Sequence, residues 1–267
     1  MDSQIGRVID ELESLGLVND TALVFHADHG WSLGENGEWE KFTVWETGTR
    51  VPLLVRAPWL NRGGGVSNEI VELVDVFPTI ANLAGLVEPE GIDGSSLVPA
   101  ILRTLNHSSG NKAEPILDDK VGEDVKQRLV PLPSHGDDVK QRLGPLPPHA
   151  GAYALSIYPR CPADLTNSSN FWKNNDCLLI ERTKIPIMGL SIRVENWRYT
   201  EYRWWLPNLS PDWERSPVGI ELFSHEGDLG DIDTYDTFEV VNLAGMEEYV
   251  EVEAALSLQL SNAYKSL

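Results

Sequence analysis

Residues 21–41 read TALVFHADHGWSLGENGEWEK, and this stretch decides the fold. Its first five residues are apolar or β-branched, which is typical of a short buried strand. A carboxylate and an imidazole, Asp28 and His29, come directly after this strand, and Gly30 lets the backbone turn there. The loop that follows is rich in glycine and ends at Lys41. Polar side chains at the carboxyl end of a strand are typical of α/β proteins, which place their chemistry at that edge.

The elements around this stretch are predicted from apolar periodicity and breaker residues. We expect helices over residues 3–15 and 67–86, the second broken or kinked by Pro78, and strands over residues 22–26 and 51–58. This order of helix, strand, strand and helix predicts an α/β fold with a mainly parallel sheet covered by helices. Residues 1–105 are interpreted as part of such a domain.

The segment of residues 106–150 has a different composition. It holds two near-copies of one unit, EDVKQRLVPLPSH at 123–135 and DDVKQRLGPLPPH at 137–149. Two copies are too few to stack into a repeat domain. Because the segment is rich in proline and charge, we expect an exposed and disordered insertion.

The remaining part, residues 151–267, shows strand signals followed by a helix. Strands are expected in the runs 152–158, 187–205 and 219–225, with a hairpin turn at Glu195 and Asn196, and a helix over 246–265. These signals predict a C-terminal α+β subdomain with a small antiparallel sheet.

The overall charge limits the class of ligand. The chain carries 41 acidic and 21 basic residues, a formal net charge of −20. This balance argues against a nucleic-acid partner, which would require a basic face. An anionic ligand must therefore be attracted by a local cation or metal site. No apolar run is long enough to predict a membrane span.

Cysteines and sequons point to an oxidising compartment. Cys161 and Cys177 bracket a polar loop of a length that favours pairing, and we expect a disulfide between them. Asn-x-Ser/Thr sequons favour a secretory chain and occur at Asn19, Asn106, Asn167 and Asn208. No signal peptide follows Met1, and the sequence begins on the first turn of a predicted helix, so we expect a piece of a longer protein.

The loop of residues 28–41 is the candidate site. A carboxylate and an imidazole that converge at a strand end suit a divalent metal, and Lys41 suits an anionic group. The glycines should let the loop double back, with the rings of Trp31 and Trp39 pinning it by burial. The alternative is structural: Asp28 caps a turn, His29 packs and Lys41 is solvated. The spacing alone leaves both interpretations open.

A family resemblance extends this interpretation. The segment 28–55 resembles the sulfatases of the alkaline phosphatase superfamily, in particular their iduronate-2-sulfatase branch. The similarity continues through the runs VELVDVFPTIANLAGL at 71–86, YPR at 158–160, IMGLSIRVENWRYTEY at 187–202, ELFSHEGD at 221–228 and VVNLAG at 240–245. It implies an alkaline-phosphatase-like fold and a sulfated glycosaminoglycan sugar as substrate.

The resemblance also implies residue roles. Asp28 and His29 match the pair that holds the divalent ion, calcium in these sulfatases, and Lys41 matches the lysine that contacts the sulfate. Trp31 matches a tryptophan beside the sugar. The resemblance places Arg193 and Arg198 near the substrate entrance, where an arginine would meet a uronate carboxylate. The alternative for both arginines is an ion pair with a neighbouring glutamate, Glu195 or Glu201.

Part of the family's machinery is not found in this sequence. Neither Cys161 nor Cys177 begins a Cys-x-Pro-x-Arg signature, so neither is the source of the family's formylglycine nucleophile. The two aspartates that complete the metal site lie earlier in the family. The resemblance therefore predicts the C-terminal half of a lysosomal or secreted sulfatase, inactive alone and requiring the N-terminal half.

Two other functions remain open. Because calcium prefers oxygen ligands, the nitrogen of His29 also suits a zinc phosphodiesterase of the same superfamily. A non-catalytic protein that binds sulfated sugars is the third interpretation.

Overall fold

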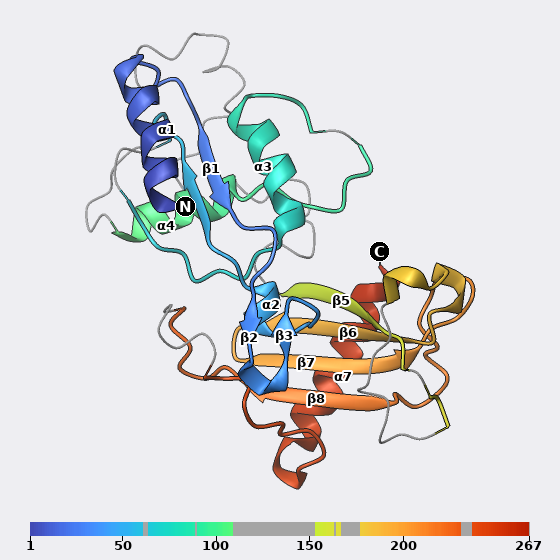
Figure 1. Ribbon diagram of the computed structural model, residues 1–267. Coiled ribbons are helices and arrows are strands. Elements are labelled where there is room, and N and C mark those ends of the chain that lie inside the picture. Colours follow the sequence, from blue (N-terminus) through green and yellow to red (C-terminus); the bar gives the residue numbers. More distant parts are fainter. Residues whose placement is uncertain are drawn as a thin grey trace. The chain divides into compact units, whose positions relative to one another are not determined.

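The computed structural model describes residues 1–60, 64–88, 90–108, 153–162, 164–166, 177–230 and 237–266. The chain divides into two compact units, shown in Figure 1. The first contains residues 1–27 and 52–151, and the second contains 28–51 and 152–267. The candidate loop thus groups with the C-terminal part of the chain, whereas the sequence placed it with residues 1–105. Beyond residue 108, the predicted insertion lies outside the described residues.

In the first unit, a helix precedes a pair of strands. The helix α1 spans Asp2–Ser14, and Gly16 just beyond its C-cap has a φ of 70°, which suits glycine. The strands β1 (Leu23–His26) and β4 (Leu53–Arg56) pair with each other. The predicted helix and both strands are confirmed, with the strands shorter than expected.

The direction of this pairing differs from the prediction. The strands β1 and β4 run antiparallel, and the described residues of this unit contain no parallel pair. The expectation of a parallel arrangement assumed a helical crossover between consecutive strands. Here residues 28–51 leave the unit and return, so β4 enters beside β1 in the opposite direction. The mixed α/β class itself is confirmed, because the described residues combine helices with antiparallel sheets.

The second predicted helix is shorter than residues 67–86. A 3-10 turn at Leu73–Asp75 leads into α3, which spans Val76–Leu83. The predicted break at Pro78 is wrong, because Pro78 lies in the first turn of α3. A proline there gives up no helical hydrogen bond, since the first backbone N–H groups have no intrahelical partner.

The first unit has a small core. Its cluster of buried apolar residues consists of Ala57, Leu83 and Val98, the last at the start of α4 (Val98–Ser108). The helix α1 has no buried residue at all, and Val8 is 71% exposed. The described part of this unit therefore leaves much of its apolar surface in contact with solvent.

The second unit contains a four-stranded antiparallel sheet. Its strands are β5 (Ala154–Arg160), β6 (Ile187–Val194), β7 (Trp197–Trp204) and β8 (Gly219–Ser224), paired in that order. Glu195 and Asn196 form the turn between β6 and β7. The antiparallel sheet and the hairpin turn predicted from the sequence are confirmed.

One face of this sheet is apolar and packs against the last helix. The helix α7 spans Val250–Lys265 and follows a 3-10 turn at Glu247–Tyr249. Figure 1 shows α7 crossing the sheet. Leu190 and Ile192 from β6 pack in one buried cluster with Leu256 and Leu260 from α7. This cluster is the larger of the two cores.

The opposite face of the sheet is polar and is covered by residues 28–51, which contain the candidate loop. This segment holds the strands β2 (Ser32–Leu33) and β3 (Trp39–Glu40), a 3-10 turn at Glu35–Gly37 and the short helix α2 (Glu46–Thr49). Side chains alternate between the two faces along a strand, so β6 directs Leu190 and Ile192 toward α7 and directs Ser191 and Arg193 the other way. The sheet is therefore covered on both faces.

A disulfide closes the end of β5. Cys161 and Cys177 are bonded, with their Cα atoms 5.6 Å apart, which confirms the predicted pair. The bond joins the end of β5 to a 3-10 turn at Cys177–Leu179.

Candidate functional site

The three predicted active-site residues meet at one point. The Lys41 Nζ atom lies 2.9 Å from His29 Nε2, and Asp28 Oδ2 lies 3.3 Å from the same nitrogen. The Asp28 side chain is 84% exposed and the His29 side chain 29%. The expected convergence is confirmed, and the metal and sulfate roles of these residues remain predictions.

Hydrogen bonds fix the state of the His29 ring. The His29 Nδ1 atom lies 2.8 Å from the carbonyl oxygen of Gly30. A carbonyl oxygen only accepts, so Nδ1 carries the proton. The lone pair of Nε2 is then left to accept a hydrogen bond from the Lys41 ammonium. The same lone pair is the one that would bind a metal, so Lys41 and a cation would share one position on the ring.

A small hairpin returns Lys41 to His29. The strands β2 and β3 pair antiparallel, with Ser32 opposite Glu40, so Lys41 follows next to the start of the loop. Gly34 and Gly37 have φ values of 121° and 79°, which favour glycine and permit the tight reversal.

The loop is not pinned by its tryptophans as expected. Trp31 is 50% exposed and Trp39 is 64% exposed, because the short hairpin directs these rings to solvent. The Trp31 ring lies 6.3 Å from the His29 ring, measured between centroids. The loop is instead attached to β5, where Glu38 pairs with Arg160 at 3.6 Å.

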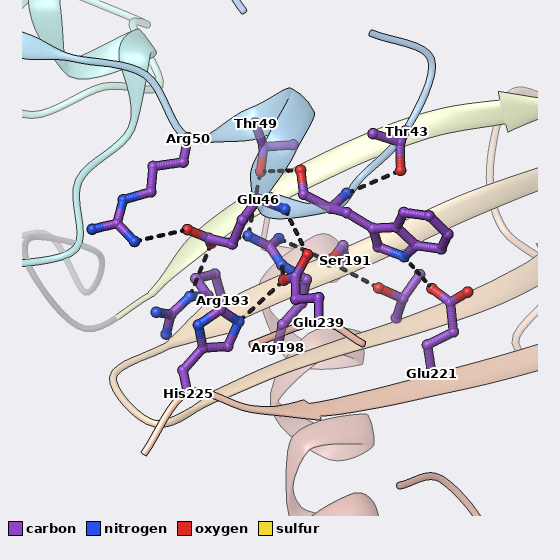
Figure 2. Close-up of polar contacts among 12 residues, drawn as sticks. Thr43, Glu46, Thr49, Arg50, Ser191, Arg193, Arg198, Glu221, His225 and Glu239 are labelled. Atoms are coloured by element: carbon purple, nitrogen blue, oxygen red, sulfur yellow. Dashed lines mark hydrogen bonds and ion pairs between the residues drawn. The ribbon is translucent and has the colours of Figure 1, made fainter. Parts of the chain in front are cut away.

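Glu46 lies at the centre of a buried ion network beneath the loop, drawn in Figure 2. Its Oε1 atom accepts from Arg198 Nη2 and, at 3.1 Å, from Arg193 Nε. Its Oε2 atom lies 3.3 Å from Arg50 Nη1. Its backbone N–H donates to Glu239 Oε2 at 2.6 Å.

The network continues through a buried histidine. The two ring nitrogens of His225 lie 3.1 Å from Asp228 Oδ2 and 3.1 Å from Glu239 Oε1. Arg198 Nε also donates to Glu239 Oε1. The His225 imidazole thus lies between two carboxylates. The network as a whole balances three arginines against three carboxylates, namely Arg50, Arg193 and Arg198 against Glu46, Asp228 and Glu239.

Burial and charge act in opposite directions on these groups. Burial raises the pKa of the Glu46 carboxyl, but the guanidinium groups of Arg198 and Arg193 outweigh it and hold this pKa at about 2. Burial lowers the pKa of Arg198, and the charges of Glu239 and Glu46 reverse that effect. Glu46 and Arg198 therefore remain ionised at neutral pH.

A neighbouring carboxyl shows the opposite balance. Burial raises the pKa of Glu221, and its hydrogen bonds from Trp45 Nε1 and Tyr202 Oη only partly offset this.

The two predicted substrate arginines belong to this network. Arg198 is only 2% exposed, and the Arg193 side chain is 12% exposed. The alternation of β6 and β7 directs both side chains onto the covered face of the sheet, so the structural alternative describes them better than substrate contact. Their carboxylate partners are Glu46, Asp228 and Glu239. Of the neighbouring glutamates named above, Glu195 contacts Arg193 through its backbone carbonyl oxygen, at 3.0 Å.

A metal ion does not suit this network, although three ligand atoms come together there. Glu46, His225 and Glu239 offer ligand atoms within 4.8 Å of one another. Arg198 already bonds to both glutamates, and the two ring nitrogens of His225 already face the carboxylates of Asp228 and Glu239. A cation would have to displace Arg198 from a site it fills, so we interpret the cluster as an ion network.

Asp28 and His29 fit one part of a divalent metal site. They bring one oxygen and one nitrogen to a common point, and the tautomer of His29 leaves the Nε2 lone pair to a metal once Lys41 moves away. The part of the chain that the structure describes adds no third His, Cys, Asp or Glu ligand there. A hard cation such as calcium takes six to eight oxygen ligands, so further ligands must come from elsewhere.

Comparison with known proteins relates this arrangement to one family. The family model for sulfatases matches residues 1–86. Human iduronate 2-sulfatase is 31% identical over 224 residues, which is 75% of this chain and 35% of the relative. Arylsulfatase K of Danio rerio is 37% identical over 108 residues, 40% of this chain and 20% of the relative. The chain thus spans about a third of the length of the iduronate 2-sulfatases it matches.

Solved structures agree on the fold. A protein in complex with its substrate D-glucosamine-2-N,6-O-disulfate superposes with a TM-score of 0.60 at 21% identity, over 99% of this chain and 38% of the other. A phosphonate monoester hydrolase from Silicibacter pomeroyi gives a TM-score of 0.62 at 22% identity, again over 99% and 38%.

The fold and the matches together define a sulfatase-type α/β protein of the alkaline phosphatase superfamily. The chain is a member of the sulfatase family. None of the helices within the described ranges is long and apolar enough to cross a membrane.

The sequence alone did not reveal the network around Glu46. A signal was present, since WETGTR at 45–50 lies inside the segment that resembles sulfatases. That signal identified the segment but gave no partner for Glu46, whose partner Glu239 is 193 positions away.

Proposed function

We propose that the chain carries the second part of a sulfatase active site, acting on sulfate esters of glycosaminoglycan sugars. The observation that carries the proposal is the convergence of Asp28, His29 and Lys41 on one point. Asp28 and His29 would supply two of the ligands of a divalent cation, calcium by resemblance. When bound, the cation supplies positive charge against the oxygens of the sulfate.

The chain's own residues would bind and orient the substrate. The Lys41 ammonium leaves His29 and contacts a sulfate oxygen, stabilising the charge that develops there. The exposed ring of Trp31 stands beside His29, where it is available to stack on a sugar. The nucleophile and two further aspartates come from the remaining part of a sulfatase domain, so this chain alone is proposed to be inactive.

A titration followed by NMR tests these roles. Calcium chloride and sodium sulfate are added to the labelled chain, and the side-chain signals of His29 and Lys41 are followed. We expect calcium to bind more weakly than about 1 mM, because the described residues bring only two ligands to this point. Sulfate should shift the Lys41 signal more when calcium is present.

Two lysine variants sharpen this titration. Lys41→Met should abolish the sulfate response at His29. Lys184→Met, at an exposed lysine that pairs with Glu181, should leave it unchanged. A sulfate response that survives Lys41→Met would contradict the proposed role of Lys41.

A phosphodiesterase is the second candidate, and the donor set is the observation that favours it. An imidazole nitrogen suits zinc better than calcium. The same titration with zinc chloride and a phosphate diester distinguishes the two. Tighter binding of zinc together with the diester would favour the phosphodiesterase.

We also propose that the protein is lysosomal or secreted. The disulfide between Cys161 and Cys177 supports this proposal, since such bonds persist in oxidising compartments. The exposed sequon at Asn208 is compatible with it.

A further inference from the structure

The short helix α2 is bonded on one side to the loop that carries the candidate site. The Gly30 N–H donates to the Gly48 carbonyl oxygen at 2.9 Å, and Ser32 Oγ donates to Thr47 Oγ1 at 2.9 Å. A Cβ atom at Gly30 would lie 2.1 Å from the Thr47 carbonyl oxygen, so the two backbones are in direct contact. The residue after His29 is therefore held against α2.

The other end of the loop is attached to the same helix. The Thr43 N–H donates to the Lys41 carbonyl oxygen at 2.9 Å, and Thr43 Oγ1 accepts from the Trp45 N–H at 3.2 Å. Only four residues separate Lys41 from Glu46, the first residue of α2. The positions of both His29 and Lys41 thus depend on where α2 sits.

The position of α2 depends in turn on the buried ion network. A helix of four residues has almost no stability of its own. Figure 2 shows Glu46 and Arg50 directed into the network. The Trp45 indole N–H donates to Glu221 Oε2 at 2.9 Å. Arg50 adds a contact of 3.1 Å to Asp228. The attachments of α2 to the sheet face are therefore mostly polar and directional.

We infer that Glu46 and Arg198 are positioning residues for the Asp28–His29–Lys41 site. Arg198 projects from the centre of the sheet, and its guanidinium bonds to both Glu46 and Glu239. This geometry fixes α2 in one orientation on β7. Through Gly48 and Thr43, α2 then sets the separation of His29 and Lys41.

The use of buried charges supports a positioning role. Burying an ion pair costs desolvation energy, so apolar residues of similar size would hold a helix on a sheet at least as firmly. Apolar contacts are not directional, whereas a guanidinium that bonds to two carboxylates specifies one geometry. A site that must hold a lysine within hydrogen-bonding distance of a histidine requires such a defined geometry.

The variants Glu46→Gln and Glu201→Gln test the inference in the full chain. Glu201 is also a buried carboxylate, 1% exposed and paired with Arg203, but it bonds to Tyr199 and Ser257 rather than to α2. Both variants should destabilise the second unit. Only Glu46→Gln should also disturb the candidate site.

Two NMR readouts report on the site independently of global stability. The first is hydrogen exchange of the Gly30 amide relative to the amides shared by β6 and β7. We expect Glu46→Gln to accelerate it about tenfold or more, because a charged hydrogen bond that holds α2 is lost. The second is the ¹⁵N shift of His29 Nε2, which should change as the Lys41 contact weakens. In Glu201→Gln both values should match those of the wild type.

A milder variant keeps the test decisive if Glu46→Gln does not fold. Trp45→Phe keeps one aromatic ring but removes the pyrrole part of the indole, and with it the N–H that bonds to Glu221 at 2.9 Å. It should change the same two readouts in the same direction but by less. Unchanged Gly30 exchange and an unchanged His29 shift in every folded α2 variant would overturn the inference.

The assignment of His29 and Lys41 to an active site rests on the proposed function. The Gly30 exchange rate and the His29 shift report only on the positions of these residues. If Glu46→Gln disturbs them and wild-type His29 does not respond to sulfate, positioning stands and the proposed function fails. If sulfate binds to the wild type and to Glu46→Gln with equal affinity, the proposed function stands and positioning fails.

Discussion

Glu46 shows how strongly one residue is defined by its partners. Its carboxylate is 4% exposed and faces three arginines, Arg50, Arg193 and Arg198. The energetic cost of desolvating this carboxylate is offset only while all three guanidinium charges are in place. A single substitution of Glu46 should therefore lower stability strongly, unlike a substitution of the exposed glutamates nearby.

The acid dependence of stability should report on Glu46. Its pKa of about 2 in the folded state is lower than the usual value near 4.5, so its contribution is present above pH 4.5 and is lost as the pH falls toward 2. The shift corresponds to about 3 kcal/mol. Urea unfolding between pH 6 and 3 should show a steep loss in the wild type and a flatter curve in Glu46→Gln. Parallel curves would contradict the assigned pKa.

Gly30 is the second residue whose environment sets a clear expectation. Gly30→Ala places a Cβ atom 2.1 Å from a backbone oxygen, so the loop or α2 must move, at a cost of about 1–3 kcal/mol or more. Chemical denaturation measures this cost. The control is Gly64→Ala, where a Cβ atom would have no neighbour within 4 Å. Equal stabilities of the two variants would show that Gly30 is not tightly packed.

At the scale of elements, local sequence patterns predicted the structures formed by neighbouring residues but not the contacts between distant ones. The β6–β7 hairpin followed from alternation and from the turn residues Glu195 and Asn196, which are neighbours in sequence. The convergence of Asp28, His29 and Lys41 was likewise predictable, because one short loop carries all three.

The direction of β4 was not predictable in the same way. It depends on the path of residues 28–51 through the other unit. The ion network was also missed, since Glu46 and Arg198 are 152 positions apart and no local pattern connects them.

The disulfide at the end of β5 should contribute measurably to the free energy of unfolding. Replacing Cys161 and Cys177 together by serine should lower the free energy of unfolding by about 3 kcal/mol, because the bond closes a loop with a sequence separation of 16. Denaturation in the absence of reductant measures this loss. Reductant should bring the wild type to the level of the variant and leave the variant unchanged. A difference that persists in reductant would contradict this account.

At the scale of the molecule, the two units differ in how completely they are covered. The sheet of the second unit has α7 on one face and the loop with α2 on the other. Within its described ranges, the first unit has a cluster of three buried apolar residues, and its helix α1 has no buried residue. This asymmetry, together with a length of about a third of the iduronate 2-sulfatases it matches, supports the proposal that a further sulfatase segment completes the site.

A complementation assay tests this central claim most directly. The chain is co-expressed with the preceding part of human iduronate 2-sulfatase, complex formation is verified by size-exclusion chromatography, and sulfate release from a sulfated uronate disaccharide is measured. We expect no turnover from either part alone and turnover from the complex. Lys41→Met should abolish this turnover and Lys184→Met should retain it. A purified complex without turnover, or turnover that survives Lys41→Met, would contradict the account.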